Sequence, residues 1–180
     1  MTVFTIGHSN HSLDTLVGLL QEHEVKTVVD VRSAPYSRYS PHFAREHLEA
    51  ALPERDLRYA YAGKYLGGRP ADPSCYKAGT LPPGDADYLR EVDYPAIMTR
   101  DWFIRGMDRL LELAMEGTTA VMCSEENPAH CHRHHLIARY LMARHPEVSV
   151  RHIRGTGLLL EAAAIPALIE KPLVIQGSLF

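Results

Sequence analysis

Thirteen residues, from Cys123 to His135, carry the densest set of reactive side chains in this chain. The segment reads Cys-Ser-Glu-Glu-Asn-Pro-Ala-His-Cys-His-Arg-His-His, so it combines two thiols, four histidines, two carboxylates and an arginine. An apolar run at residues 119–122 precedes the segment, and another at residues 136–142 follows it. This pattern predicts a loop that leaves a buried strand and enters a helix, which is where open α/β sheets bind their ligands.

Strand-like and helix-like patterns alternate along the chain. Short apolar or alternating runs, typical of strands in a largely buried sheet, occupy residues 2–6, 25–31, 57–61, 118–122 and 148–153. Apolar residues at helical spacing predict helices at residues 13–23, 41–52, 94–116, 136–145 and 159–169. The alternation predicts a single three-layer α/β domain over residues 1–180, Rossmann-like, with a mainly parallel sheet of about five strands.

Residues 70–93 interrupt this alternation, because proline, glycine and aspartate dominate them. We expect these residues to form a loop-rich insertion or lid without regular structure. The composition of the whole chain, with 46% hydrophobic and 23% charged residues, is ordinary for a globular protein. The sequence therefore predicts one domain with an insertion.

Charge and cysteine content bear on the partners and on the cellular compartment. The formal net charge of -3 does not support nucleic-acid binding through bulk positive charge, and no apolar stretch approaches the roughly 20 residues of a membrane span. Three cysteines cannot all pair with one another, and the first residues do not resemble a secretion signal. We therefore expect a cytoplasmic protein with no membrane partner.

Polar segments at residues 7–9, 30–33, 65–68 and 123–133 follow predicted strands. Because parallel strands bring their carboxyl ends to one edge of the sheet, we expect these segments to converge. The candidate acid, base and nucleophilic groups are His8, Asp30, Cys123, Glu125 and Cys131. The candidate substrate-binding residues are Ser9, Arg32, Arg38, Tyr65, Gly67, Gly68, His132 and Arg133.

Three arginines predict an anionic ligand. Arg32, Arg38 and Arg133 all lie in predicted loops or at a helix start, where guanidinium groups bind phosphate or carboxylate in a bidentate manner. At Arg133 the N-terminus of the predicted helix adds free N–H groups. The alternative is that these arginines form surface salt bridges and that Asp30 only holds Arg32 in place.

The cysteines and histidines allow two interpretations. Thiolate and imidazole are the preferred ligands of zinc, and the ligands would be Cys123, Cys131, His132 and one of His130, His134 or His135. The spacing matches common zinc motifs poorly, so the sequence assigns no metal ligand. In the second interpretation, Cys123 or Cys131 is a thiol of lowered pKa near a helix N-terminus, and His132 or Glu125 transfers a proton.

The four polar segments also resemble the signature blocks of a known family. The matching residues are Thr5-Ile-Gly-His-Ser9, Asp30-Val-Arg-Ser33 with Pro35 and Ser37-Arg38, Tyr65-Leu-Gly-Gly68, and Cys123 with Glu125, Pro128 and Cys131-His-Arg133. In this order they are similar to the prokaryotic family catalogued as domain of unknown function 488. The resemblance implies a compact cytoplasmic α/β domain with a polar site built from these blocks, and it implies no reaction.

We interpret the chain as an enzyme that binds an anionic small molecule, such as a nucleotide, at the carboxyl edge of the sheet. Carboxylates beside an anion site suit hydrolysis of an N-glycosidic or phosphate bond. One alternative is a non-catalytic module that senses a nucleotide or a metal. Another alternative is a structural zinc domain.

Overall fold

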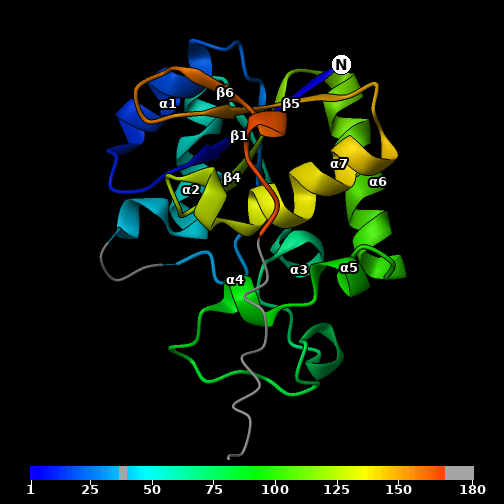
Figure 1. Cartoon of the computed structure of the whole chain (residues 1–180). Coiled ribbons are helices and arrows are strands. Elements are labelled where there is room, and N and C mark those ends of the chain that lie inside the picture. Colours follow the sequence, from blue (N-terminus) through cyan, green and yellow to red (C-terminus); the bar gives the residue numbers. More distant parts are fainter. Residues whose placement is uncertain (37–39, 169–180) are drawn as a thin grey trace, which may run out of the picture.

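The computed structural model of the chain describes residues 1–36 and 40–168. Within these residues, six strands form one sheet in the order β3-β2-β4-β1-β5-β6 (Figure 1). The strands are β1 (Thr2–Gly7), β2 (Thr27–Asp30), β3 (Arg58–Tyr61), β4 (Thr119–Cys123), β5 (Ser149–Ile153) and β6 (Leu159–Glu161). All neighbours pair in parallel except β5 and β6. The prediction of a single α/β domain with a mainly parallel sheet is confirmed.

Helices cover both faces of the sheet. The helices α1 (Leu13–Gln21) and α2 (Arg45–Ala51) share one apolar core with the sheet, and α6 (Asp101–Glu116) and α7 (Arg139–Arg144) share the other. Successive strand residues serve opposite cores, because side chains alternate across a strand: Val28 joins the α1 core and Val29 the α6 core. This two-sided burial explains why the strand sequences are almost continuously apolar.

The chain from residue 154 to 164 differs from the sequence prediction. Instead of starting a helix, it turns at Gly157, whose φ of 83° favours glycine, and returns antiparallel to β5 as strand β6. A short 3-10 turn, Ala162–Ala164, follows. The prediction of a helix at residues 159–169 is therefore wrong for the residues that the structure describes. Pairing with the exposed edge of β5 prevails over the local helical pattern, and residue 169 lies outside the described part.

Other element boundaries also differ from the predictions. The helix expected at 94–116 is divided into α5 (Tyr94–Ile97) and α6. The helix expected at 41–52 starts as a 3-10 turn, Pro41–Phe43, before α2, and the glycine loop at 65–68 starts inside a short helix, α3 (Gly63–Leu66). A π-helical segment, Arg133–Ala138, precedes α7. Such segments often occur at functional sites.

Residues 70–93 contain some regular structure, contrary to the prediction. They form a 3-10 turn, Pro73–Cys75, and a short helix, α4 (Tyr88–Glu91), and a bridge joins Tyr76 to Val92. The side chains of Cys75, Tyr76 and Val92 are buried in the α6 core. This segment lies at the lower end of the view in Figure 1. Its base is therefore part of the folded domain.

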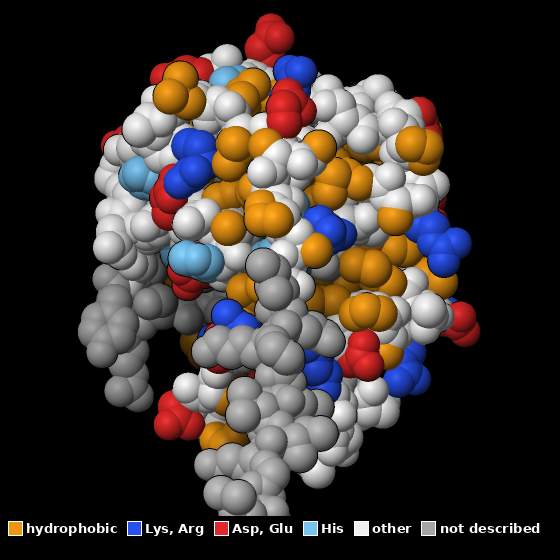
Figure 2. All heavy atoms as spheres, viewed as in Figure 1, with side chains coloured by type: hydrophobic (Ala, Val, Ile, Leu, Met, Phe, Trp, Pro, Cys, Tyr) orange, Lys and Arg blue, Asp and Glu red, His pale blue; other side chains and the backbone are white. Residues whose placement is uncertain are grey.

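The helices and the surface add two observations about partners. No helix in the described ranges is long and apolar enough to cross a membrane. Figure 2 shows cationic and acidic side chains interspersed on this face of the molecule, without a continuous basic surface. Neither observation identifies a partner.

The end of β1 allows a direct test of packing. A Cβ atom on Gly7 would lie 1.8 Å from the main-chain oxygen of Glu125, so Gly7→Ala must displace the loop after β4. We expect Gly7→Ala to lower the free energy of unfolding by about 3 kcal/mol. Gly18→Ala in α1 is the matched control, because its Cβ would have no neighbour within 4 Å, and it should stabilise by about 0.5–1 kcal/mol. Equal effects of both variants in urea unfolding would contradict this description.

Candidate functional site

The carboxyl ends of β1, β2 and β4 bring three of the predicted polar segments side by side. The N–H groups of His8 and Ser9 donate to the carbonyls of Cys123 and Ser124 over 2.9 and 2.8 Å, and Val31 N–H donates to Met122 over 3.0 Å. The parallel ladder therefore continues past the strands into their loops. Residues 8–9, 31–32 and 123–124 lie next to one another for this reason.

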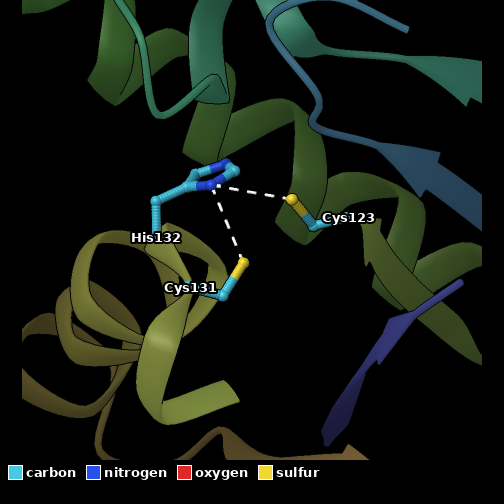
Figure 3. Close-up of side chains that lie close together, drawn as sticks. All are labelled: Cys123, Cys131 and His132. Carbon is cyan, nitrogen blue, oxygen red and sulfur yellow. Dashed lines mark hydrogen bonds between the residues drawn. The ribbon is translucent and has the colours of Figure 1, made fainter. Parts of the chain in front are cut away.

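Cys123, Cys131 and His132 form a compact cluster at this edge (Figure 3). Cys123 ends β4, whereas Cys131 and His132 follow a 3-10 turn, Pro128–His130. The His132 Nδ1 atom lies 3.7 Å from Cys123 Sγ and 3.8 Å from Cys131 Sγ, and all three ligand atoms lie within 4.8 Å of one another. Asn127 stabilises the turn by accepting the Ala129 N–H over 3.0 Å. The local fold thus brings together three side chains that zinc prefers.

The two buried thiols of this cluster interact through one shared proton. The hydrogen bond that the Cys123 thiol donates to Cys131, together with burial, raises the pKa of Cys123 well above its usual value. Burial alone would raise the pKa of Cys131, but hydrogen bonds from Cys123 and His132 outweigh it and hold that pKa well below its usual value. Cys131 is therefore the more acidic thiol of the pair.

Gly68 makes room for the imidazole of His132. A Cβ atom on Gly68 would lie 2.5 Å from His132 Cγ, so only glycine fits against the ring without displacement. With His132 Nδ1 facing the sulfur atoms, the other ring nitrogen, Nε2, is buried and has no hydrogen-bond partner in the described part of the chain. Packing and the contacts of Nδ1 with the sulfur atoms hold the ring, whereas Nε2 remains unsatisfied.

A cavity of about 450 Å³ opens at the cluster. Four segments line it: the loop after β2, the loop after α3, the 86–89 segment with Tyr94, and the loop after β4. Its lining residues are Arg32, Ser33, Ala34, Tyr36, Gly68, Arg69, Ala86, Asp87, Tyr88, Leu89, Tyr94, Cys123, Ser124, Glu125, His130, Cys131 and His132. The insertion at 70–93 thus contributes one wall, and Glu125 is an exposed carboxylate of this lining.

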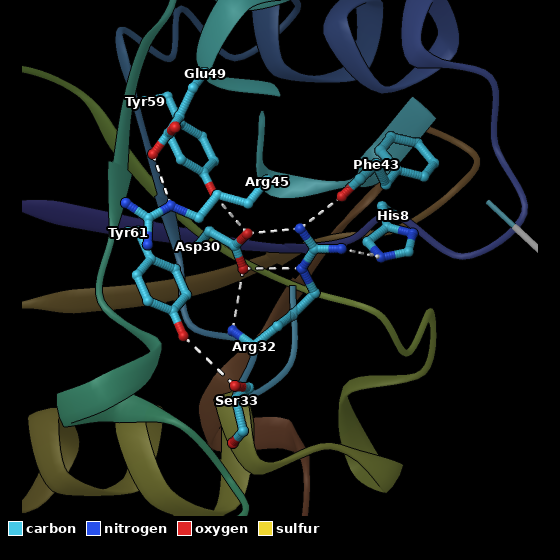
Figure 4. A network of polar contacts seen from close by, with 9 residues as sticks. All are labelled: His8, Asp30, Arg32, Ser33, Phe43, Arg45, Glu49, Tyr59 and Tyr61. Carbon is cyan, nitrogen blue, oxygen red and sulfur yellow. Dashed lines mark hydrogen bonds and ion pairs between the residues drawn. The ribbon is translucent and has the colours of Figure 1, made fainter. Parts of the chain in front are cut away.

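Asp30 and Arg32 form a buried ion pair beside the cavity (Figure 4). Arg32 Nε and Nη2 donate to the two carboxylate oxygens of Asp30 over 2.9 and 2.6 Å, and Nη2 also donates to the Phe43 carbonyl over 2.8 Å. Tyr59 OH donates to the same carboxylate over 2.7 Å. Asp30 is fully buried and saturated, so this geometry favours the alternative in which it organises the loop over the predicted role of acid or base.

His8 completes this network as a neutral acceptor. Its Nε2 accepts from Arg32 Nη1 over 3.2 Å, which leaves the proton on Nδ1 to donate to the Ser9 carbonyl over 3.0 Å. Burial and the neighbouring Arg32 charge lower the pKa of His8 to about 4. His8 does not line the cavity, and its ring stacks on Phe43. The arrangement leaves it without access to a substrate in this cavity.

Arg133 differs most from its predicted role. Its side chain is 0% exposed, Nε donates to Thr5 Oγ1 over 3.2 Å, and Nη2 donates to the Glu126 carbonyl over 2.6 Å. Nη1 donates to the Glu125 carbonyl. The Arg133 guanidinium therefore cannot bind a phosphate as predicted, because it is buried and its N–H groups bind the loop after β4. Arg32 is likewise committed to Asp30.

The remaining candidates are dispersed. Ser9 has a left-handed backbone, φ 46°, and lies outside the lining, and Gly67 packs against Ser33. Tyr65 lines a separate cavity with Tyr59 and other residues, and Arg38 lies outside the described residues. His130, His134 and His135 do not join the cysteines as ligands, so the zinc interpretation has three described ligands where four were expected.

Sequence reasoning missed Arg69 and Tyr88, which both line the cavity. The Arg69 guanidinium stacks on the Tyr88 ring, 4.4 Å from its centroid, and the Arg69 N–H donates to Ser33 Oγ over 2.9 Å. Arg69 directly follows Gly67 and Gly68, which the sequence pattern assigns to substrate binding. This position could have identified Arg69 as a site residue. Nothing in the local pattern of residues 70–93 pointed to Tyr88.

Comparison with known proteins gives one match. The family described as Domain of unknown function DUF488 matches residues 12–141, which is more than half of the chain. The resemblance seen in the sequence is confirmed. No curated protein and no solved structure matches the chain.

The buried ion pair predicts a large effect of a small change. Asp30→Asn leaves the Arg32 guanidinium buried without its counter-charge, so we expect the free energy of unfolding to fall by about 3–5 kcal/mol. Glu49→Gln is the matched control, because Glu49 and its partner Arg45 are 44% and 41% exposed, and it should cost less than about 1 kcal/mol. Urea unfolding of the two variants measures the difference. Similar losses would contradict the role given to Asp30.

His8 predicts loss of stability in acid. The unfolded chain takes up a proton near pH 6.5, whereas folded His8 does so only near pH 4, so stability is full above pH 6.5 and falls between these values. The loss from His8 amounts to about 3 kcal/mol. In urea unfolding from pH 7.5 to 4, the free energy of unfolding should fall less steeply in His8→Asn than in the wild type. Part of the fall should remain in the variant, because the pKa of buried His152 is also lowered, to about 3. An unchanged pH slope would contradict the prediction.

Proposed function

The chain belongs to the family named for Domain of unknown function DUF488, and because that name carries no reaction, we propose its function from the site itself. Cys123, Cys131 and His132 bind one zinc-like divalent metal ion, and the protein is a metal-dependent hydrolase of a small molecule held in the adjacent cavity. The observation that carries this proposal is the mutual approach of the three ligand atoms within 4.8 Å.

The distances in the cluster suit a tetrahedral metal centre. Zinc–sulfur bonds of about 2.3 Å and zinc–nitrogen bonds of about 2.0–2.1 Å place ligand sulfur and nitrogen about 3.5–3.6 Å apart. The two sulfur–nitrogen distances in the cluster are 3.7 and 3.8 Å. Each sulfur–nitrogen distance therefore exceeds the value for a bound zinc ion by only a few tenths of an ångström.

Hydrogen bonding alone accounts for the cluster less well. A neutral imidazole nitrogen has one lone pair or one proton, so Nδ1 can make a single good hydrogen bond, yet both sulfur atoms lie at nearly equal distance from it. A metal ion uses all three atoms at once. It also displaces the proton that the two thiols share, which removes the need to bury a lone thiolate.

The number of ligands favours catalysis over a structural role. Structural zinc sites are closed by four protein ligands, whereas catalytic sites keep one position for water or substrate. The described residues supply three cysteine or histidine ligands, and residues 37–39 and 169–180 contain neither residue type. All three ligands line the cavity, so the open position would be accessible to a small molecule.

The chemistry follows from that open position. A divalent ion lowers the pKa of bound water to about 7, which supplies a nucleophile at neutral pH. Glu125 lies two residues after Cys123, is exposed and lines the same cavity, so it is the carboxylate assigned to proton transfer. Asp30 and His8 have no part in this proposal, because Asp30 is ion-paired with Arg32 and His8 accepts a hydrogen bond from it.

Metal content tests the proposal. Protein expressed without a tag and dialysed against zinc should hold about one equivalent by plasma mass spectrometry, and Cys131→Ser and His132→Ala should each lose most of it. Cys75→Ser is the matched control, because Cys75 is a buried free thiol that is not among the clustered ligands, so this variant should keep its metal. Cobalt substitution should add a thiolate-to-metal absorption band that Cys123→Ser weakens. Wild-type protein that binds no metal above the level of Cys131→Ser would overturn the proposal.

Glu125 separates catalysis from mere metal binding. Glu125→Gln should keep the metal equivalent but reduce hydrolysis of a substrate found by screening phosphate esters, amides and N-glycosides, by about 10²–10⁴-fold in kcat. Glu126→Gln is an informative comparison, because Glu126 is engaged with Arg154 and with the Gly155 N–H. An unchanged kcat in Glu125→Gln would remove Glu125 from the mechanism and leave the metal result intact.

A further inference from the structure

We propose that Arg69 is the anion-binding residue of the cavity, so that the substrate class is a small organic anion, a phosphate monoester or a carboxylate. The inference rests on the proposed function only in that it names the substrate of the same site. Arg69 thereby takes the anion-binding role that the sequence pattern predicts for Arg32, Arg38 and Arg133.

The other cavity-lining guanidinium is already engaged. Arg32 donates to Asp30, to the Phe43 carbonyl and to His8 Nε2. The Arg69 guanidinium, by contrast, has no hydrogen bond or ion pair in the part of the chain that the structure describes, and its side chain is exposed. Among the described residues, Arg69 is therefore the cavity-lining arginine whose guanidinium N–H groups are free to bind a ligand.

Arg69 is held in place without using those donors. Its main-chain N–H is bound to Ser33 Oγ, and its guanidinium lies over the face of Tyr88. Stacking uses the faces of the two planar groups, so the N–H donors in the guanidinium plane stay free. A pre-positioned planar fork of this kind suits bidentate binding of phosphate or carboxylate oxygens.

The loop around Arg69 connects it to the cysteine and histidine cluster. Gly68, the preceding residue, packs directly against the His132 ring. A ligand whose anionic group contacts Arg69 can therefore extend along the same cavity toward Cys123 and Cys131. The lining also contains Tyr36, which is 72% exposed and offers an aromatic surface for an apolar or planar part of the ligand.

Once a metal is bound, the charges of the lining leave Arg69 as the place where an anionic group can bind. A divalent ion with two thiolates and a neutral imidazole has no net charge, so the centre neither attracts nor repels an anion by its overall charge. Asp87 is paired with Arg90 over 3.2 Å, which offsets its charge. Glu125 and Arg69 remain as opposite charges of the lining, and Arg69 can direct the anionic end of a substrate away from Glu125.

Binding of matched probes to zinc-loaded protein tests the inference. By isothermal titration calorimetry, phenyl phosphate or benzoate should bind at least about tenfold more tightly than the neutral analogues phenol and benzamide. Arg69→Ala should abolish this preference, whereas Arg69→Lys should retain part of it, because it keeps the charge but loses the fork. Preference for phenyl phosphate alone assigns a phosphate ester, and preference for benzoate alone assigns a carboxylate.

Two controls keep this test separate from folding and from the metal. Arg144→Ala removes an exposed arginine outside the lining and should leave the preference unchanged, and Tyr88→Leu should weaken it by loosening Arg69. Arg69→Ala should keep its zinc equivalent and its unfolding midpoint. If wild type shows no preference for the anions, or Arg69→Ala retains it, the inference is overturned. An Arg69-dependent preference in protein that binds no metal would overturn the metal centre and leave the anion site standing.

Discussion

The buried guanidinium of Arg133 holds the candidate site together. It joins Thr5 on β1 to the carbonyls of Glu125 and Glu126 in the loop after β4. A buried guanidinium without partners would cost several kcal/mol, so these carbonyls are kept facing it. Because Arg133 directly follows Cys131 and His132 in the chain, the same bonds set where those two side chains stand relative to Cys123.

A second buried cation organises the opposite wall of the cavity. Arg32 is fixed by Asp30, and the next residue, Ser33, accepts the main-chain N–H of Arg69. The ion pair at the end of β2 thus fixes the start of the wall that carries Arg69. Two arginines that a sequence pattern assigns to substrate are instead structural supports, and the exposed Arg69 depends on one of them for its position.

The sequence predicted the sheet well because burial on both faces leaves a nearly continuous apolar run, as at residues 118–122. It also predicted that Cys123 and Cys131 lie at the carboxyl edge. It left the role of Arg32 open between an anion contact and a pair with Asp30. It could not predict the role of Arg133, since the partners of Arg133 are mostly main-chain carbonyls, which no residue pattern reveals. The hairpin at Leu159–Glu161 was missed because its stability comes from pairing with β5, a contact between segments and not a local preference.

The protonation of the two cysteines in the cluster differs with and without a metal ion. Without one, burial opposes ionisation of Cys131, whereas hydrogen bonds from Cys123 and His132 and the positive charge of Arg133 lower its pKa. With a divalent ion, both sulfur atoms become thiolates, and the shared proton leaves. His132 contributes in both states, because its Nδ1 atom contacts both sulfur atoms and is the nitrogen that would bind a metal. Its Nε2 atom is a buried group without a partner in the described part of the chain, and a metal at Nδ1 would leave it so.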